Sequence, residues 1–223
     1  MRLFTLLCLA GLISCSESKV EKEDSFSTEV STSTPVEKSG NIFSFQPCQL
    51  DANLHYSIYY PTRFKNIEKF PILILFDPHG DPDFPLEKYK SLADEYDFIL
   101  LASKDSKNGN SAEQTANIIQ SMLYQSIQIE KVDTNQIFVG GFSGGARVAS
   151  MLALSPSGVK GLVICGAGIP AGSWTGVPPH LVIGIAGNRD MNLTEIINFK
   201  THDPRMMSRY HIIRYSGDHA WPL

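Results

Sequence analysis

Residues 136–145 read Gln136-Ile137-Phe138-Val139-Gly140-Gly141-Phe142-Ser143-Gly144-Gly145. The apolar half of this stretch predicts a buried strand, and the residues from Ala146 to Leu154 that follow it favour a helix. Ser143 therefore lies at a sharp turn between strand and helix, where the glycines beside it lack a Cβ that would collide. A serine at such a turn is typical of a nucleophile, although glycines that merely allow a turn would give the same pattern.

The rest of the chain predicts more buried strands. Five short runs are almost continuously apolar, as strands of a parallel sheet are: Ile72 to Phe76, Phe98 to Ala102, Ile137 to Val139, Leu162 to Cys165 and Leu181 to Ile185. Between them, residues 111–127 predict a helix that begins with a capping box of Ser111 and Gln114. Alternating residues within 42–60 suit an antiparallel pair at the sheet edge. We expect an α/β fold with a mostly parallel central sheet, antiparallel first strands and helices on both faces.

Two downstream residues could activate the serine. Asp190 follows the strand that ends near Ile185, and His219 follows an apolar run from Tyr210 to Tyr215. A serine hydroxyl needs an imidazole base, and the imidazole needs a carboxylate to orient it. Because strands of an open α/β sheet end at one rim, Ser143, Asp190 and His219 are expected to meet there. Asp190 could instead cap the next helix, and two other carboxylates compete for its role: Asp203 and Asp218.

Three motifs carry a resemblance to a known family. They are His79-Gly80 after an early strand, the Ser143 turn, and Gly217-Asp218-His219-Ala220-Trp221 near the end of the sequence. In this order they resemble the α/β-hydrolases, in the branch of polyhydroxybutyrate depolymerase-like, feruloyl esterase-like and dienelactone hydrolase-like esterases. The resemblance covers residues 41–223 and implies the Ser-Asp-His order of that fold.

The family position also implies an oxyanion hole. One donor is expected from the backbone N–H of Gly144, and the second from Asp81, with Gly80 as the alternative, because Pro82 has no N–H. The carboxylate of Asp81 must then point away from the oxyanion. By the same resemblance we expect a reduced C-terminus without the usual last helix, and hence an exposed apolar sheet face. The polar loop of residues 103–109 and Trp174 are expected near the rim.

The N-terminus predicts export and lipid anchoring. Residues 1–14 have a short basic start and an apolar segment too short to span a bilayer, which is typical of a signal peptide. The end of this segment resembles a bacterial lipobox, which makes Cys15 the expected lipidated residue. Residues 15–40 are polar and favour a disordered tether, so the α/β-hydrolase domain is expected at 41–223. We therefore expect an exported protein in the bacterial cell envelope, attached to the membrane through its lipid.

Composition narrows the remaining choices. The formal charge of −4 and the lack of a basic cluster argue against a nucleic-acid partner. The histidines and acidic residues show no convergent metal-ligand spacing, so we expect no metal and no cofactor. Cys48 and Cys165 could form a disulfide, but separate buried thiols are the favoured interpretation.

These observations predict a serine esterase that hydrolyses an ester-containing small molecule or polymer through an acyl-enzyme on Ser143. The absence of a lid insertion favours soluble or polymer-bound esters over lipid droplets. Two alternatives stay open from the sequence. One is a catalytically inactive lipoprotein that binds glycan or peptide, and the other is a peptidase or acyltransferase with the same three residues.

Overall fold

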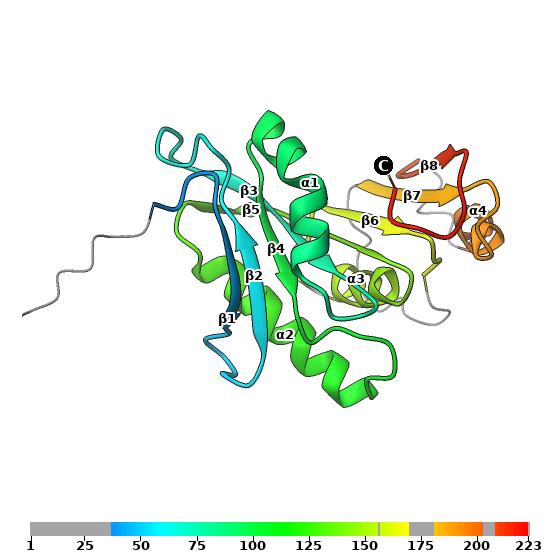
Figure 1. Cartoon of the computed structure of the whole chain (residues 1–223). Coiled ribbons are helices and arrows are strands. Elements are labelled where there is room, and N and C mark those ends of the chain that lie inside the picture. The colour runs from blue at the N-terminus through cyan, green and yellow to red at the C-terminus, as the bar shows by residue number, and fades with distance from the viewer. Residues whose placement is uncertain (1–36, 156, 170–180, 203–207, 223) are drawn as a thin grey trace, which may run out of the picture. The chain divides into compact units, whose positions relative to one another are not determined.

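The computed structural model describes residues 37–155, 157–169, 181–202 and 208–222, in which eight strands form one sheet in the order β1-β2-β4-β3-β5-β6-β7-β8. β2 is antiparallel to both of its neighbours, and the other pairs are parallel. The strands are β1 Ile42–Pro47, β2 His55–Tyr59, β3 Phe70–Phe76, β4 Ile99–Ser103, β5 Val132–Phe142, β6 Gly161–Cys165, β7 Leu181–Gly187 and β8 Tyr210–Tyr215. Figure 1 shows this arrangement. Cys15, Trp174 and Asp203 lie outside the described residues.

Helices cover the two faces of the sheet unequally (Figure 1). The described helices are α1 Asp83–Tyr96, α2 Ala112–Gln128, α3 Gly144–Leu154 and α4 Leu193–His202. Side chains of a strand alternate between faces, so Ile72 and Ile74 of β3 join the larger core with α2, α3 and α4. Leu73 and Leu75 face the other way, into a smaller core with α1. The predicted α/β fold, with antiparallel first strands and helices on both faces, is confirmed.

Most predicted elements are present with small shifts of their ends. α2 has Ser111 as its N-cap and the predicted capping box with Gln114. β5 is much longer than its apolar run predicts, because the polar residues of its first half, such as Asp133, precede the buried stretch. The sequence analysis did not single out α1, in which few positions are buried: Pro85, Leu86 and Ala93.

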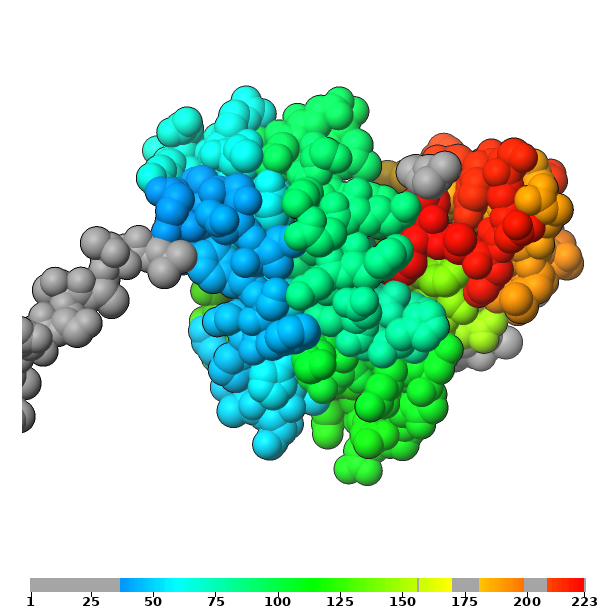
Figure 2. Space-filling model, in the orientation of Figure 1, coloured from blue at the N-terminus to red at the C-terminus, as the bar shows by residue number. Residues whose placement is uncertain are grey.

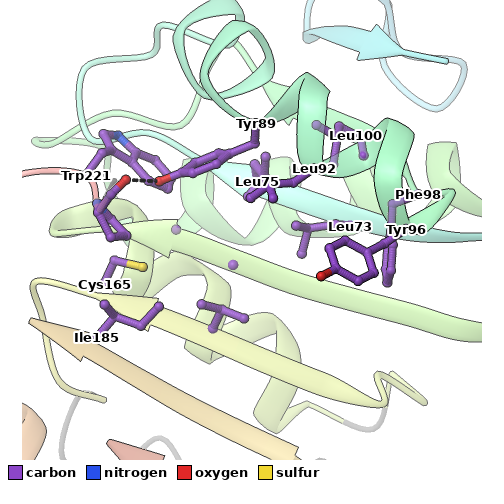
Figure 3. A pocket seen from close by; sticks show the side chains of 15 residues that line it. Leu73, Leu75, Tyr89, Leu92, Tyr96, Phe98, Leu100, Cys165, Ile185 and Trp221 are labelled. Atoms are coloured by element: carbon purple, nitrogen blue, oxygen red, sulfur yellow. Dashed lines mark hydrogen bonds between the residues drawn. The ribbon is translucent and has the colours of Figure 1, made fainter. Parts of the chain in front are cut away.

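An apolar groove lies on the sheet face that carries α1. Its volume is about 320 Å³. Tyr89 and Trp221 lie at one end and Tyr96 and Phe98 at the other, as Figure 3 shows. Among the described helices only α1 packs on this face. The sequence predicted an exposed apolar sheet face, but the strand residues that line this groove are buried, as Leu75 and Leu100 are, or half-buried, as Leu73 is. Within the described residues, no helix has both the length and the apolar character needed to cross a membrane.

The two described cysteines, Cys48 and Cys165, are buried free thiols, so the disulfide considered above does not form between them. Burial raises the pKa of Cys48 to about 11 and the pKa of Cys165 to about 12. Both thiols therefore stay protonated at neutral pH and act as small apolar side chains.

Candidate active site

Ser143 occupies the turn between β5 and α3. Its φ of 51° and ψ of −119° place a non-glycine residue in a sparsely populated region, which costs free energy unless the surroundings hold it there. Two backbone hydrogen bonds do so: Ser143 N–H donates to the Cys165 carbonyl at 2.8 Å, and Ala146 N–H donates to the Ser143 carbonyl at 3.0 Å. The strained turn is thus fixed by β6 on one side and by α3 on the other.

The glycines of the turn are required by close backbone approach. A Cβ on Gly145 would lie 2.0 Å from the Phe76 carbonyl oxygen, at the end of β3. A Cβ on Gly141 would lie 2.4 Å from the carbonyl oxygen of Gly145 itself. Neither position could hold a larger residue without a backbone shift, so the glycine pattern in the sequence follows directly from the packing of this turn.

The structure brings Ser143, His219 and Asp190 together. His219 Nε2 lies 3.0 Å from Ser143 Oγ, and His219 Nδ1 lies 2.9 Å from Asp190 Oδ1. The Asp190 carboxylate is fully buried and the His219 ring is 20% exposed. With a proton on Nδ1, the imidazole donates to Asp190 and accepts the hydroxyl proton of Ser143. This is the arrangement that makes a serine nucleophilic.

Asp190 is held by the turn after β7. Its Oδ1 accepts hydrogen bonds from both His219 Nδ1 and the backbone N–H of Asn192, the latter at 2.8 Å. Asp190 therefore supports the turn before α4 and orients the histidine with the same carboxylate. The structure thus shows a contact of Asp190 with the turn before α4 and one with His219, while its catalytic role stays a prediction.

The competing carboxylate of Asp218 has a different partner. It lies next to His219 in the chain but is exposed, and it pairs with Arg189 at 2.7 Å. The hydrogen bond from Arg189 lowers the pKa of Asp218. Since Arg189 precedes Asp190, this ion pair joins the loop of Asp190 to the loop of His219.

One predicted oxyanion donor, Gly144, directly follows the serine, and the two candidates for the second, Gly80 and Asp81, lie in the loop after β3. Gly144 is the first residue of α3. Asp81 N–H points to Asp77 Oδ1 at 3.5 Å, and Gly80 N–H points to the Asp77 carbonyl at 3.4 Å. Both distances are at the outer limit of a hydrogen bond, so either N–H could turn toward an oxyanion at the loss of only a weak hydrogen bond. Which of the two is the second donor stays a prediction.

The side chain of Asp81 points toward α1. Its Oδ1 accepts a hydrogen bond from the backbone N–H of Phe84 at 3.2 Å, in the first turn of that helix. The negative charge of Asp81 therefore lies at the N-terminus of α1, where it stabilises the helix. A backbone donor at position 81 stays a prediction.

The loop after β4 borders the site, as its position in the sequence suggested. Asn108 N–H donates to the Pro78 carbonyl at 2.8 Å. A Cβ on Gly144 would lie 1.9 Å from Asn108 Oδ1, so the Asn108 side chain lies directly against the predicted oxyanion hole. Among the described residues, no group of three or more His, Cys, Asp or Glu side chains could hold a metal ion.

The sequence analysis gave no role of their own to two residues of this region, Asp77 and Trp221. Asp77 is buried directly after β3, and its Oδ2 accepts a hydrogen bond from Trp221 Nε1 at 2.9 Å. Trp221 was noted only as part of the motif around His219. The sequence signal that could have pointed to Asp77 is an aspartate directly after an apolar run, as at Asp190 after β7.

The sheet order, the serine turn and the three convergent side chains define the α/β-hydrolase fold. The comparisons with solved structures agree. The chain is similar to an S-formylglutathione hydrolase from Staphylococcus aureus, with a TM-score of 0.64 and 15% identity over 83% of this chain and 92% of that one. It is also similar to a thermophilic esterase from Thermogutta terrifontis, with a TM-score of 0.61 and 13% identity over 81% of this chain and 84% of that one.

A third similar structure is a dienelactone hydrolase-like promiscuous phosphotriesterase from metagenomic libraries, with a TM-score of 0.56 and 11% identity over 75% of this chain and 78% of that one. No family model and no curated protein matches the sequence. At these identities the likeness establishes the fold. The protein has the α/β-hydrolase fold, and the resemblance read from its three motifs is confirmed at that level.

Proposed function

We propose that the protein is a serine hydrolase that cleaves carboxylic esters through an acyl-enzyme on Ser143. The observation that carries the proposal is the placement of His219 Nε2 3.0 Å from Ser143 Oγ, while Asp190 lies 2.9 Å from the other ring nitrogen. Esterases among the similar structures, such as the one from Thermogutta terrifontis, support the choice of an ester substrate.

In the acylation step, His219 Nε2 accepts the hydroxyl proton while Ser143 Oγ attacks the acyl carbon. The negative charge moves to the former carbonyl oxygen, where the backbone N–H of Gly144 and that of Asp81 or Gly80 stabilise it. The tetrahedral intermediate then collapses, the C–O bond to the alcohol breaks, and the imidazolium returns its proton to the leaving oxygen. Asp190 stabilises the imidazolium throughout.

In the deacylation step, a water molecule takes the place of the alcohol. His219 removes one proton from this water, the hydroxide attacks the acyl carbon, and Ser143 Oγ leaves and recovers the proton. The products are a carboxylic acid and the free enzyme. The cycle uses side chains, backbone N–H groups and water, so the proposal requires no cofactor.

The test is the replacement of Ser143. We expect the protein to hydrolyse short p-nitrophenyl esters and to react with a fluorophosphonate probe, and Ser143→Ala to lose both. Ser155→Ala, at the far end of α3, removes a hydroxyl that is bonded to the Leu152 carbonyl and should leave both intact. A folded wild-type protein that neither turns over esters nor binds the probe would favour the non-catalytic glycan- or peptide-binding alternative. Turnover of peptides, or transfer to an alcohol in place of water, would identify the peptidase or acyltransferase alternative.

We further propose that the enzyme is anchored in the bacterial envelope by acyl chains on Cys15. The support is the short apolar segment before Cys15 and the polar residues after it. Several acyl chains on one residue would give stable membrane attachment. Incorporation of labelled palmitate by the full-length protein in bacteria, and its loss in Cys15→Ala, is the expected result. Equal labelling of the two proteins would contradict the anchor.

A further inference from the structure

Asp77 connects two loops of the proposed active site. It is the first residue after β3 and only 3% of its surface is exposed. A carboxylate buried to this degree needs several hydrogen-bond donors to replace the water it has lost. The donors that Asp77 uses come from two segments far apart in the sequence.

Each carboxylate oxygen of Asp77 serves one of these segments. Oδ1 accepts the backbone N–H of His79 at 2.8 Å and, weakly, that of Asp81 at 3.5 Å, so it holds the loop of the second oxyanion donor. Oδ2 accepts Trp221 Nε1 at 2.9 Å, two residues beyond His219. Figure 2 shows the C-terminal residues packed against the segment that contains this loop and α1.

The indole of Trp221 continues the connection to the reacting residues. Its ring packs on Phe142 with centroids 5.6 Å apart, and Phe142 packs on the His219 ring at 4.6 Å. Phe142 is the residue before Ser143. Asp77 accepts the indole N–H of Trp221 and so fixes this ring. A shift of the ring would move Phe142, and with it both His219 and Ser143.

We propose that Asp77 is a positioning residue of this enzyme, which fixes the oxyanion loop and the His219 loop relative to each other through Trp221. The inference rests on the proposed function. Asp77 acts through other groups: its oxygens bond the backbone of the oxyanion loop and the indole, and it takes no part in proton transfer. Misplacement of catalytic groups by a fraction of an ångström to about 1 Å lowers turnover by up to roughly 100-fold.

Tyr89 serves as a control, because it contacts the C-terminal segment but not the oxyanion loop. Tyr89 Oη donates to the Pro222 carbonyl at 2.8 Å, so it also ties the C-terminal segment to the body of the protein. Figure 3 shows this bond at the end of the groove beside Trp221. Tyr89→Phe removes a tie of the C-terminal segment without touching the oxyanion loop.

The experiment compares three variants with the wild-type protein in kcat and KM for a p-nitrophenyl ester. Trp221→Phe keeps an aromatic ring against Phe142 but loses the N–H, and we expect kcat to fall about tenfold with KM changed less than threefold. In Asp77→Asn, an NH₂ group replaces one carboxylate oxygen and faces either the indole N–H of Trp221 or the backbone N–H of His79, so two donors meet. We expect a fall of roughly 100-fold in kcat. Tyr89→Phe should keep kcat within about twofold.

Coupling between the two positions gives a second readout. In the double variant Asp77→Asn, Trp221→Phe, the amide NH₂ no longer faces an indole N–H. The fall in kcat should therefore be smaller than the product of the two single effects. Because Trp221→Phe retains most of the packing, it keeps the test valid if Asp77→Asn does not fold.

The outcomes separate this inference from the proposed function. If wild-type protein hydrolyses the ester, Ser143→Ala does not, and Asp77→Asn and Trp221→Phe keep full kcat, Asp77 has no positioning role while the hydrolase assignment stands. An equal fall of kcat in Tyr89→Phe and Trp221→Phe would show that the contact between Asp77 and Trp221 only attaches the C-terminal segment, and would overturn the positioning role. If wild-type protein is inactive, both proposals fall together.

Discussion

His219 Nδ1 lies 2.9 Å from Asp190 Oδ1 because the two residues follow neighbouring parallel strands in matched register. Gly187 at the end of β7 pairs with Tyr215 at the end of β8. Asp190 comes three residues after the first and His219 four residues after the second. Parallel pairing therefore delivers both side chains to the same rim, and Ser143 arrives there from β5.

Asp190→Asn removes the negative charge of this side chain and keeps its shape, so it tests whether the charge is needed for catalysis. Asp190→Asn retains an oxygen for His219 and Asn192 but cannot stabilise the imidazolium, so kcat should fall by on the order of 10³ to 10⁴. Asp218→Asn is the matched control, since that exposed carboxylate pairs with Arg189 and not with the histidine. It should change kcat less than about threefold, as expected for an exposed pair. Equal losses in the two variants, measured with a p-nitrophenyl ester, would contradict the role of Asp190.

Gly166 provides the space in which the three residues meet. Its φ is +62°, and a Cβ there would lie 2.6 Å from the Phe142 ring and 3.1 Å from both Asp190 Oδ2 and His219 Cε1. We expect Gly166→Ala to lower kcat by at least about tenfold, because the histidine or the carboxylate must move. The measurement is kcat together with the urea-unfolding midpoint.

A second glycine controls for backbone strain alone. Gly158 has a φ of +73°, and nothing lies within 4 Å of a Cβ at that position. Gly158→Ala should cost about 1 kcal/mol of stability, as an alanine does at positive φ, with kcat unchanged. If both alanine variants lose stability alike and neither loses activity, the space at Gly166 is not needed for catalysis.

The capping box of α2 gives a prediction on stability. Ser111 Oγ accepts Gln114 N–H at 3.1 Å, and Gln114 Oε1 accepts Ser111 N–H at 2.8 Å. Ser111→Ala removes the acceptor for the first of these and should lower the free energy of unfolding by about 1 kcal/mol, measured by urea denaturation. Ser111→Asp restores a side-chain acceptor and should recover most of the loss. No difference between the alanine and aspartate variants would show that the cap contributes nothing.

The parts of the site that follow a strand could be predicted from the sequence. Ser143, Asp190 and His219 each come directly after an apolar run, and the geometry of parallel sheets then places them together. The hydrogen bond between Asp77 and Trp221 could not be predicted, because the two residues are 144 positions apart and neither the strand before Asp77 nor the motif around His219 indicates that they pair. The direction of the Asp81 side chain depends on α1, whose few buried positions give a weak periodicity.

The buried thiol of Cys165 predicts how stability depends on pH. Burial raises its pKa to about 12 in the folded protein from an ordinary value of 9.0. Between these values the unfolded chain loses a proton that the folded protein keeps, so stability falls as pH rises. The contribution is fully present below pH 9.0 and is lost progressively toward pH 12.

Urea unfolding under reducing conditions from pH 8 to pH 10 measures this dependence. The free energy of unfolding should decrease above pH 9 with a slope that approaches about 1.4 kcal/mol per pH unit from Cys165. Cys48 adds in the same direction, since burial also raises its pKa. Staying at or below pH 10 limits the contribution of buried tyrosines such as Tyr60, whose pKa is raised to about 12. Cys165→Ala should be less stable at pH 8 because of the cavity, yet lose less stability up to pH 10 than wild-type protein. An unchanged slope in that variant would mean that the thiol is ionised equally in the folded and unfolded states.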